Sequence, residues 1–434
     1  MNLLRSRRRT AVLLAIAAGL VFTGCTTEEK DAADSGSQSG GPAPVARVAP
    51  GVTDDSIKIG VAYPDLTAAK QFIKTDHGDY QATFNALIKK VNDAGGINGR
   101  KIVPVFGAIN VLSPAAAQET CVKLTQDEKV FAVIGSFNAN EPLCYVQTNK
   151  TAVIGGPLTA KNYAQAQAPW FSDQRGGDEV ADAMALFNQG NALVGKKVAV
   201  VAPVNEEALV KEIVVPALQK LGITPVETAL GDASNRDAAA VAQQMGVFIQ
   251  KFQASGADTV VVVGGSGGEF PKQLEKTSYR PRLLFTSTSQ VGTYLNDPSA
   301  KHDYSTMNNA SAVALNTLWS EPRLQECVAA VEAAIPDLKG KLTDPLLLPP
   351  GEPQPQVSLD TACRTLSLFQ SIAEKAGRDL NYETFQNAGL SLGSYQNPRM
   401  VDKANYTREN PHGAIPAVLW NYDPASRKFV VAAR

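Results

Sequence analysis

Short apolar segments recur along the chain, and longer segments with one apolar face lie between most of them. The short segments are rich in β-branched residues, which is typical of strands that are buried on both faces. In the first of the longer segments, Phe84, Leu87 and Val91 recur at the spacing i, i+3 and i+7 of a helix. Eight of the predicted strands are 56–62, 101–106, 130–136, 151–156, 197–203, 223–227, 259–264 and 283–287.

Further helices are predicted at 176–189, 206–221 and 237–254. Strands that alternate with amphipathic helices predict an α/β fold with parallel sheets covered on both faces. About ten strands are too many for one compact doubly wound domain. The segment 168–178 (A-P-W-F-S-D-Q-R-G-G-D) interrupts the pattern, and we expect the chain to cross there into a second lobe.

The first 24 residues have the pattern of an export signal. A basic segment, M-N-L-L-R-S-R-R-R-T, precedes twelve apolar residues, which are too few to span a bilayer with margin. The following T-G-C resembles a lipobox, in which the cysteine, here Cys25, receives a diacylglycerol before cleavage. An uncleaved signal anchor is the alternative, and the adjacent arginines leave twin-arginine export open beside the general route. We expect no transmembrane helix in the mature chain.

Residues 25–52 are expected to form a flexible tether, because Ser, Gly, Pro, Ala and acidic residues dominate them. A lipid on Cys25 followed by a tether describes a domain moored outside the cell membrane. The chain as a whole carries 41 Lys and Arg against 42 Asp and Glu. So balanced a charge gives no global attraction to nucleic acid, and we expect no nucleic-acid partner.

Five cysteines are present, and assigning Cys25 to the lipid leaves an even number. Outside the cytoplasm this predicts two disulfides, for which three pairings exist. We favour Cys121–Cys144 and Cys327–Cys363, because each pair lies within one helix–loop–helix neighbourhood; buried free thiols are the alternative. The three histidines lie far apart and no C-x-x-C occurs, so we expect neither a metal site nor a cofactor.

Small polar residues follow nearly every predicted strand. Ligands of α/β sheets bind outside the carboxyl ends of the strands, so these residues are candidates for one ligand cleft. Each segment taken alone is equally compatible with ordinary turn chemistry. The segments are 63–65, 135–138, 156–159, 204–206, 264–266 and 287–290.

One of these segments, G-G-S-G-G around Ser266, fits the G-x-S-x-G of a serine hydrolase, with His302 or His412 downstream. No oxyanion loop of the H-G-G-G type accompanies it. The segment matches neither G-x-G-x-x-G nor a Walker motif, which argues against a nucleotide site. We interpret Ser266 as a residue of the cleft wall and keep the hydrolase as a remote alternative.

Four segments resemble the leucine/isoleucine/valine-binding group of extracellular solute-binding proteins, the type I periplasmic binding proteins that feed ABC importers. They are D-S-I-K-I-G-V-A-Y, N-A-L-I-K-K-V-N-D-A-G-G-I-N-G-R-K-I, V-F-A-V-I-G-S and A-V-I-G-G-P, of which A-G-G-I-N-G-R-K-I (94–102) is the most specific. The resemblance covers about 54–434, loosely over 300–400.

The resemblance implies two doubly wound parallel-sheet lobes that trap ligand between them. We expect the first lobe to contain residues 53–172 and about 291–395. The second lobe then contains residues 173–290 and about 396–434.

By resemblance, Ser136 binds a ligand carboxylate, assisted by Leu158 and Thr159. The second lobe departs from the family, because the usual aromatics and the usual acid are not evident there. An α-amino acid is therefore a doubtful cargo unless Asp65, Glu206 or Glu207 substitutes. The full set of expected ligand residues is Tyr63, Asp65, Ser136, Phe137, Leu158, Thr159, Asn205, Ser266, Ser289 and Gln290.

We therefore expect a lipid-anchored, non-enzymatic, extracytoplasmic protein that delivers a small polar solute to the permease of an ABC importer. The alternative from another class is a sensing lobe that presents its ligand to a signalling receptor.

Overall fold

The computed structural model describes residues 45–432, apart from 71–75, 139, 233–236, 296, 298–300, 346–347 and 349–351. The described residues belong to one compact unit, Gly41–Arg434. The predicted export signal, Cys25 and most of the predicted tether lie outside them. Within the described residues, no helix is both long enough and apolar enough to cross a membrane.

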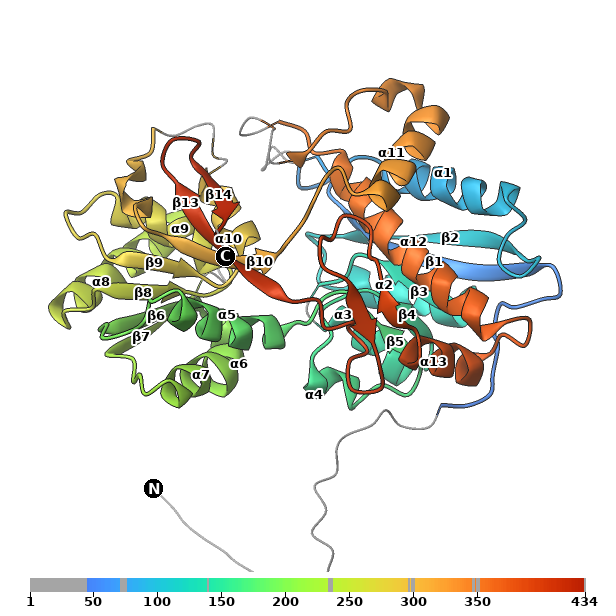
Figure 1. Cartoon of the computed structure of the whole chain (residues 1–434), viewed down its shortest axis with the longest axis horizontal. Helices are drawn as coiled ribbons and strands as arrows, with labels where there is room; N and C mark the ends of the chain where they lie inside the picture. The colour runs from blue at the N-terminus through green and yellow to red at the C-terminus, as the bar shows by residue number, and fades with distance from the viewer. Residues whose placement is uncertain are drawn as a thin grey trace, which may run out of the picture. The chain divides into compact units, whose positions relative to one another are not determined.

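Among the described residues, the first sheet has five strands, which are all parallel. It is the sheet that contains β1 to β5 in Figure 1. Their order is β2 (Lys101–Asn110), β1 (Ser56–Asp65), β3 (Ala132–Gly135), β4 (Ala152–Ile154) and β5 (Trp170–Phe171). Since β1, β3 and β4 are neighbours that run in the same direction, their carboxyl ends lie along one edge.

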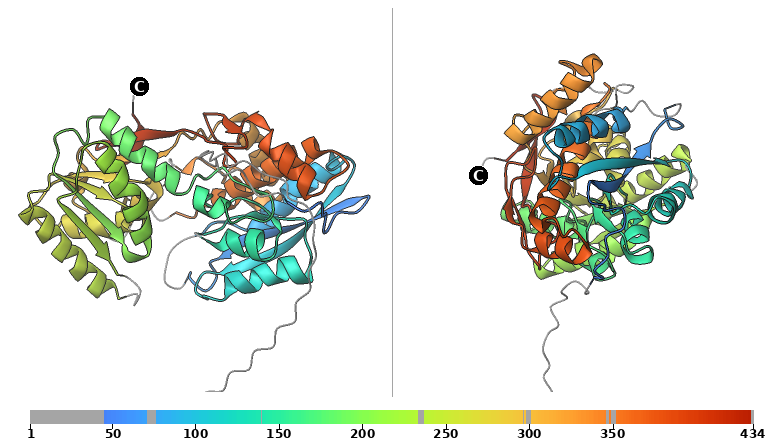
Figure 2. Two further views of the ribbon diagram at one scale, coloured as in Figure 1. Left: turned by 90° about the horizontal axis from the view of Figure 1, so that it is seen from below. Right: turned by 90° about the vertical axis from the view of Figure 1, so that its right-hand side faces the viewer.

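Helices cover both faces of this sheet (Figure 2). Ile57, Ile59 and Val61 of β1 join a core formed with α1 (Tyr80–Asp93), α11 (Pro322–Ala334), α12 (Gln356–Ala376) and α13 (Tyr382–Leu390). Ala62 and Val133 join the opposite core, which includes α2 (Ala116–Val122) and η2 (Cys144–Thr148). Successive strand residues face opposite sides, so an uninterrupted apolar strand fills both cores.

The second sheet has seven strands in the described residues. Their order is β14 (Lys428–Val431), β13 (Ala417–Asp423), β10 (Ser311–Leu315), β9 (Arg282–Phe285), β8 (Thr259–Val262), β6 (Val198–Pro203) and β7 (Glu227–Gly231). The five strands from β10 to β7 are parallel, whereas β13 and β14 form an antiparallel hairpin at one edge. One core contains α8 (Ala238–Ala254), α9 (Ser266–Leu274) and α10 (Thr288–Leu295), and the other contains α5 (Gly177–Gln189), η4 (Val210–Val214) and α7 (Val215–Lys220).

Shorter elements connect these layers. They are η1 (Lys123–Asp127), α3 (Glu141–Leu143), α4 (Ala160–Tyr163), η3 (Val204–Glu206), α6 (Glu207–Leu209), η5 (Tyr304–Met307), η6 (Pro336–Leu338), β11 (Gly393–Tyr395) and β12 (Ala404–Tyr406).

The α/β class with parallel sheets is confirmed, and seven of those eight predicted strands each share at least three residues with an observed strand. The predicted strand 223–227 is displaced, because β7 begins only at Glu227. The apolar residue that suggested the earlier start, Ile223, packs in a loop against the core that contains η4 and α7. The apolar residue thus belongs to a half-buried loop that precedes the strand.

The chain does not return between the lobes at either of the two positions expected from the sequence. Residues 291–315 do not return to the first lobe, because β10 pairs with β9 in the second sheet. Residues from about 396 do not yet belong to the second lobe, because Tyr406 and Ile415 are buried in the core of the first. The segments that cross between the sheets are 172–176, 316–321 and 407–416.

Two disulfides are present with the favoured pairing. Cys121–Cys144 joins α2 to η2, and Cys327–Cys363 joins α11 to α12. The sequence separations are 23 and 36 residues.

Removing either disulfide is expected to lower the free energy of unfolding by about 3–4 kcal/mol, since loops of this length lose closure entropy in the unfolded chain. Urea unfolding of Cys121→Ala/Cys144→Ala and of Cys327→Ala/Cys363→Ala measures the effect. Reduction of the wild-type protein, followed by alkylation, provides the matched control. An unchanged unfolding midpoint in both double variants would contradict the expectation.

Candidate functional site

The carboxyl ends of the first-lobe strands bring three of the expected ligand segments to one edge. Tyr63 lies near the end of β1, Ser136 directly follows β3, and Thr159 lies in the segment after β4. The neighbouring strands are in register at this edge, where Ala62 pairs with Gly135. Ser136 is half-buried, and its backbone N–H donates to the carbonyl oxygen of Ala62 at 3.0 Å. Its backbone N–H is therefore occupied by the fold, so the hydroxyl is the group that Ser136 can offer to a ligand.

Tyr63 is fixed by residues that the sequence did not single out. Its ring stacks on Tyr80 with centroids 5.3 Å apart, and its hydroxyl accepts a hydrogen bond from Gln81 Nε2 at 2.6 Å. Both partners open α1, which begins after the N-cap Asp79. An Asp at the N-cap is a sequence signal for the start of a helix. That the start of α1 lies against the end of β1 depends on the tertiary fold.

Asp65 belongs to a turn. One of its oxygens accepts from the backbone N–H of Thr67 at 2.9 Å, and hydrogen bonding to Thr67 lowers the pKa of Asp65. Its carboxylate is therefore ionised and engaged locally, which makes Asp65 a poor substitute for the missing second-lobe acid.

The side chains of Phe137 and Leu158 are buried, and the hydroxyl of Thr159 is engaged in a helix cap. Phe137 is buried against Tyr145 with ring centroids 5.6 Å apart, and Leu158 is also buried. The hydroxyl oxygen of Thr159 caps α4 by accepting from the backbone N–H of Asn162 at 3.1 Å. Phe137 and Leu158 therefore shape the edge from within the core.

In the second lobe, an acidic side chain lies against the glycine-rich segment 264–268. Glu206 ends η3 after β6, and Gly264 follows the neighbouring strand β8. A Cβ atom added at Gly264 would lie 1.9 Å from Glu206 Oε2, so the carboxylate rests directly on this glycine. Gly264 has a φ of +48°, which glycine adopts without strain. Gly264 thus leaves space for the carboxylate, because it has no Cβ, and it allows the left-handed backbone conformation after β8.

Burial raises the pKa of Glu206 above its ordinary value of 4.5, and a hydrogen bond from the backbone of Gly265 opposes that rise. Desolvation of a carboxylate has this effect, because the charged form loses its water. A cation beside Glu206 would replace the lost solvation. Glu206 is thus a candidate to substitute for the usual second-lobe acid of the family, which is not evident in this sequence.

Ser266 begins α9 and is only 3% exposed. Its hydroxyl has no hydrogen-bond partner among the described residues. His302 Nδ1 lies 2.9 Å from Glu275 Oε1, and His412 Nδ1 accepts from the backbone N–H of Ala414. The described contacts thus give no support to a Ser–His pair at Ser266.

The remaining second-lobe candidates lie on the same sheet edge. Asn205 is exposed in η3, after β6. Ser289 is exposed at the start of α10, after β9, and its hydroxyl lies 2.8 Å from that of Ser287. Gln290 packs closely on Gly267, where an added Cβ would lie 2.9 Å from the Gln290 Cβ. Because β9, β8 and β6 are neighbours, these residues flank Ser266 and Glu206.

A buried ion network lies beside the first crossing and was not anticipated. Arg364 of α12 pairs with Asp173 of that crossing and with Asp360, whose Oδ2 is 3.1 Å from Arg364 Nε. Arg399 reaches the same Asp360 oxygen at 3.4 Å. Burial alone would lower the pKa of Arg364, but Asp173 and Asp360 outweigh it and raise that pKa. The adjacent Ser172 donates to the Gly156 carbonyl at 2.6 Å, so the network adjoins the strand-end segment after β4.

Neither of two cavities in the second lobe is lined by an expected ligand residue. One, of about 560 Å³, includes Arg282 and Tyr422, and the other, of about 410 Å³, includes Asn188 and Lys196. In the described part of the chain, no group of three or more His, Cys, Asp or Glu side chains is arranged to hold a metal.

Comparison with family models matches residues 56–404 to the model described as periplasmic binding protein. Comparison with curated protein sequences gives no match.

Several solved structures are similar in fold. An ABC transporter substrate-binding protein from Desulfitobacterium hafniense in complex with Leu is 15% identical, covers 87% of this chain and 100% of its own, and gives a TM-score of 0.58. A type 1 periplasmic binding protein from Bordetella pertussis Tohama I is 15% identical over 88% and 100%, with a TM-score of 0.62. A solute-binding protein of an ABC transporter from R. palustris, in complex with 4-hydroxybenzoate, is 15% identical over 88% and 96%, with a TM-score of 0.59.

Proposed function

From the premise that this chain belongs to the periplasmic binding protein family, we propose that it captures a small polar solute, amino-acid-like or related, and delivers it to the permease of an ABC importer. The expected type I fold is confirmed by the family match and the similar structures, and the family and these neighbours are non-enzymatic solute-binding proteins. Family membership also implies an extracytoplasmic location.

The observation that carries the proposal is the carboxylate of Glu206 seated on Gly264, two positions before Ser266, whose buried hydroxyl has no hydrogen-bond partner among the described residues. On the other lobe, Ser136 and Thr159 follow neighbouring strands. A ligand that contacts the residues of both lobes stabilises the closed arrangement. It does so only to the extent that its contacts involve both lobes. Leu and 4-hydroxybenzoate, named with two of the similar structures, are both carboxylates. We assign the solute's carboxylate to the Ser136 side and an amino group, where present, to Glu206.

Identification of the bound solute tests this function. Protein isolated from its native source is denatured, the released compounds are identified by mass spectrometry, and the compound found is titrated into ligand-free protein by calorimetry. A small carboxylate that rebinds with one-to-one stoichiometry supports the proposal. Uptake of that solute should then be lost from cells without this protein. Unchanged uptake together with a lost transcriptional response would favour the sensing alternative.

Affinity for an amino-bearing solute is expected to fall as the pH decreases through the pKa of Glu206. That pKa is raised by burial in the free protein, whereas a bound ammonium group favours the ionised carboxylate and lowers it. Affinity therefore declines by up to about tenfold per pH unit once the pH is below the free-protein value. The same linkage means that ionised Glu206 reduces folding stability above its folded pKa, and this cost is absent below the ordinary value of 4.5.

Calorimetric titrations from pH 7 downward measure this effect, and Glu206→Gln provides the matched control. The variant should bind more weakly at neutral pH and should lose the pH dependence. An equal dependence in both proteins would exclude Glu206 as the titrating group.

We further propose that Cys25 carries a lipid that moors the protein to the membrane, as the T-G-C after the apolar segment suggests. Cys25→Ser is expected to abolish lipid labelling and release most of the protein from the membrane fraction, because the diacyl anchor is lost. Fractionation with a radiolabelled fatty acid measures both. Cys25→Ser that still sediments with membranes as the wild type does would point to an uncleaved anchor.

A further inference from the structure

A cavity of about 560 Å³ lies at the opposite end of the second sheet from the candidate ligand edge. Arg282 in its wall is the first residue of β9, whereas the ligand-edge segment 287–290 follows the last. Amide side chains dominate the rest of the wall, which includes Asn308, Asn309 and Asn421. The cavity is therefore separate from the site assigned to the transported solute, and its wall is polar.

Arg282 lacks a carboxylate partner in the described residues. Its Nη2 donates to Ser311 Oγ at 3.1 Å, and its Nε is buried without a hydrogen-bond partner. Burial lowers the pKa of Arg282, and no described acid opposes that effect. A half-buried guanidinium with an unused donor is costly unless an acceptor from outside the protein pairs with it.

Tyr422 adds a second unused group to the wall. The residue is 6% exposed, and its hydroxyl is buried without a partner among the described residues. The ring is held by Phe429 at a centroid distance of 5.9 Å, so the hydroxyl position is fixed by packing.

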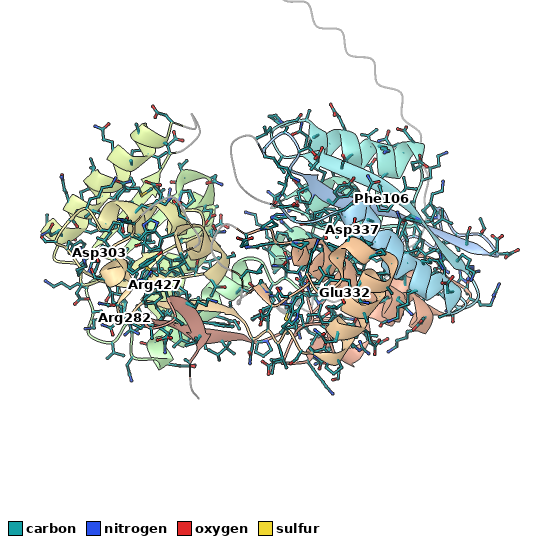
Figure 3. The ribbon with its side chains drawn as sticks, turned by 90° about the horizontal axis from the view of Figure 1, so that it is seen from above. Phe106, Arg282, Asp303, Glu332, Asp337 and Arg427 are labelled. Atoms are coloured by element: carbon teal, nitrogen blue, oxygen red, sulfur yellow. A yellow bond between two sulfur atoms is a disulfide. The ribbon has the colours of Figure 1, made fainter. Side chains whose placement is uncertain are left out.

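The nearby charges leave the cavity net positive. Arg427, in the β13–β14 turn, lies over the Tyr304 ring with its Cζ 5.0 Å from the centroid (Figure 3). Asp303 is paired with Arg280 at 2.7 Å. Asp423 accepts from the backbone N–H groups of its own turn. Asp423 keeps its charge, and the three arginines Arg280, Arg282 and Arg427 against the two acids leave one net positive charge.

We propose that this cavity is a second ligand site, which binds a small phosphate-type oxyanion through Arg282, the asparagine amides and the Tyr422 hydroxyl. Arginine presents several N–H donors in a planar fork that fits such anions, and amide N–H and hydroxyl groups supply further donors. The site does not depend on the solute or on the importer, so it stands or falls separately from the proposed function.

Inorganic phosphate is the probe for this site. Calorimetric titration of the whole protein at constant ionic strength is expected to give saturable binding, which sodium chloride does not reproduce. Arg282→Gln should weaken phosphate binding at least tenfold. Tyr422→Phe should weaken it several-fold and leave the thermal unfolding midpoint nearly unchanged, because the ring packing is retained. Arg408→Gln, which removes an exposed arginine of the crossing segment 407–416, is the matched control and should bind as the wild type does.

One further variant makes the test decisive. Ser136→Ala should keep its phosphate binding; loss there would place the anion at the solute edge and overturn the proposal. Absence of saturable binding in the wild type, or equal affinity in Arg282→Gln and Arg408→Gln, would also overturn it. If Arg282→Gln fails to fold, the comparison of Tyr422→Phe with the wild type decides.

Discussion

Asp173→Ala is expected to lower the free energy of unfolding by about 3–5 kcal/mol, the usual cost of removing one partner from a buried ion pair. The side chains of Asp173 and Arg364 are 6% and 14% exposed, so little water can replace the lost carboxylate. Asp360 would remain, but it is shared with Arg399. Urea unfolding followed by circular dichroism measures the loss.

Lys89→Ala is the control for this comparison. Lys89 and Asp93 form an ion pair whose side chains are 70% and 64% exposed, and exposed pairs contribute about 0–1 kcal/mol. Asp173→Ala that costs no more than Lys89→Ala would show that the Arg364 network does not stabilise the first crossing.

Gly264→Ala is expected to weaken solute binding by about 10- to 150-fold, which corresponds to the loss of a charge-assisted hydrogen bond. The new Cβ would lie only 1.9 Å from Glu206 Oε2 and would push the carboxylate away from the ligand edge. The free energy of unfolding should fall by only about 1–2 kcal/mol, which is the cost of the left-handed φ at an alanine. The clash itself costs little, because the flexible Glu206 side chain can move. Calorimetry with the co-purified solute and thermal unfolding separate the two effects.

Gly265→Ala is the matched control, since its Cβ would make only an ordinary contact with Pro203 Cγ at 3.5 Å. That variant should bind solute as the wild type does. Equal loss of affinity in both variants would mean that the position of Glu206 is not what Gly264 protects.

The sequence was sufficient for the parallel-sheet architecture and for the edge that carries the candidate site. Runs such as T-V-V-V-V mark strands buried on both faces, and the small polar residues after them mark the carboxyl ends. The disulfide pairs were also predictable, because each pair joins elements that are close in sequence.

Contacts between distant segments were not predictable in this way. Glu206 and Gly264 are 58 positions apart, and Asp173 and Arg364 are 191 apart. Their meeting depends on strand order, which local periodicity does not encode. The same limit explains the misplaced lobe boundaries, because the pairing of β10 with β9 is a property of the assembled sheet.

Small-angle scattering with and without the co-purified solute tests capture between the two lobes most directly. Binding by both Ser136 and Glu206 should reduce the radius of gyration of the wild-type protein as the lobes close. Glu206→Gln, at a solute concentration that saturates only the wild type, should show no such reduction. An unchanged radius of gyration in wild-type protein that calorimetry shows to be saturated would contradict capture between the lobes.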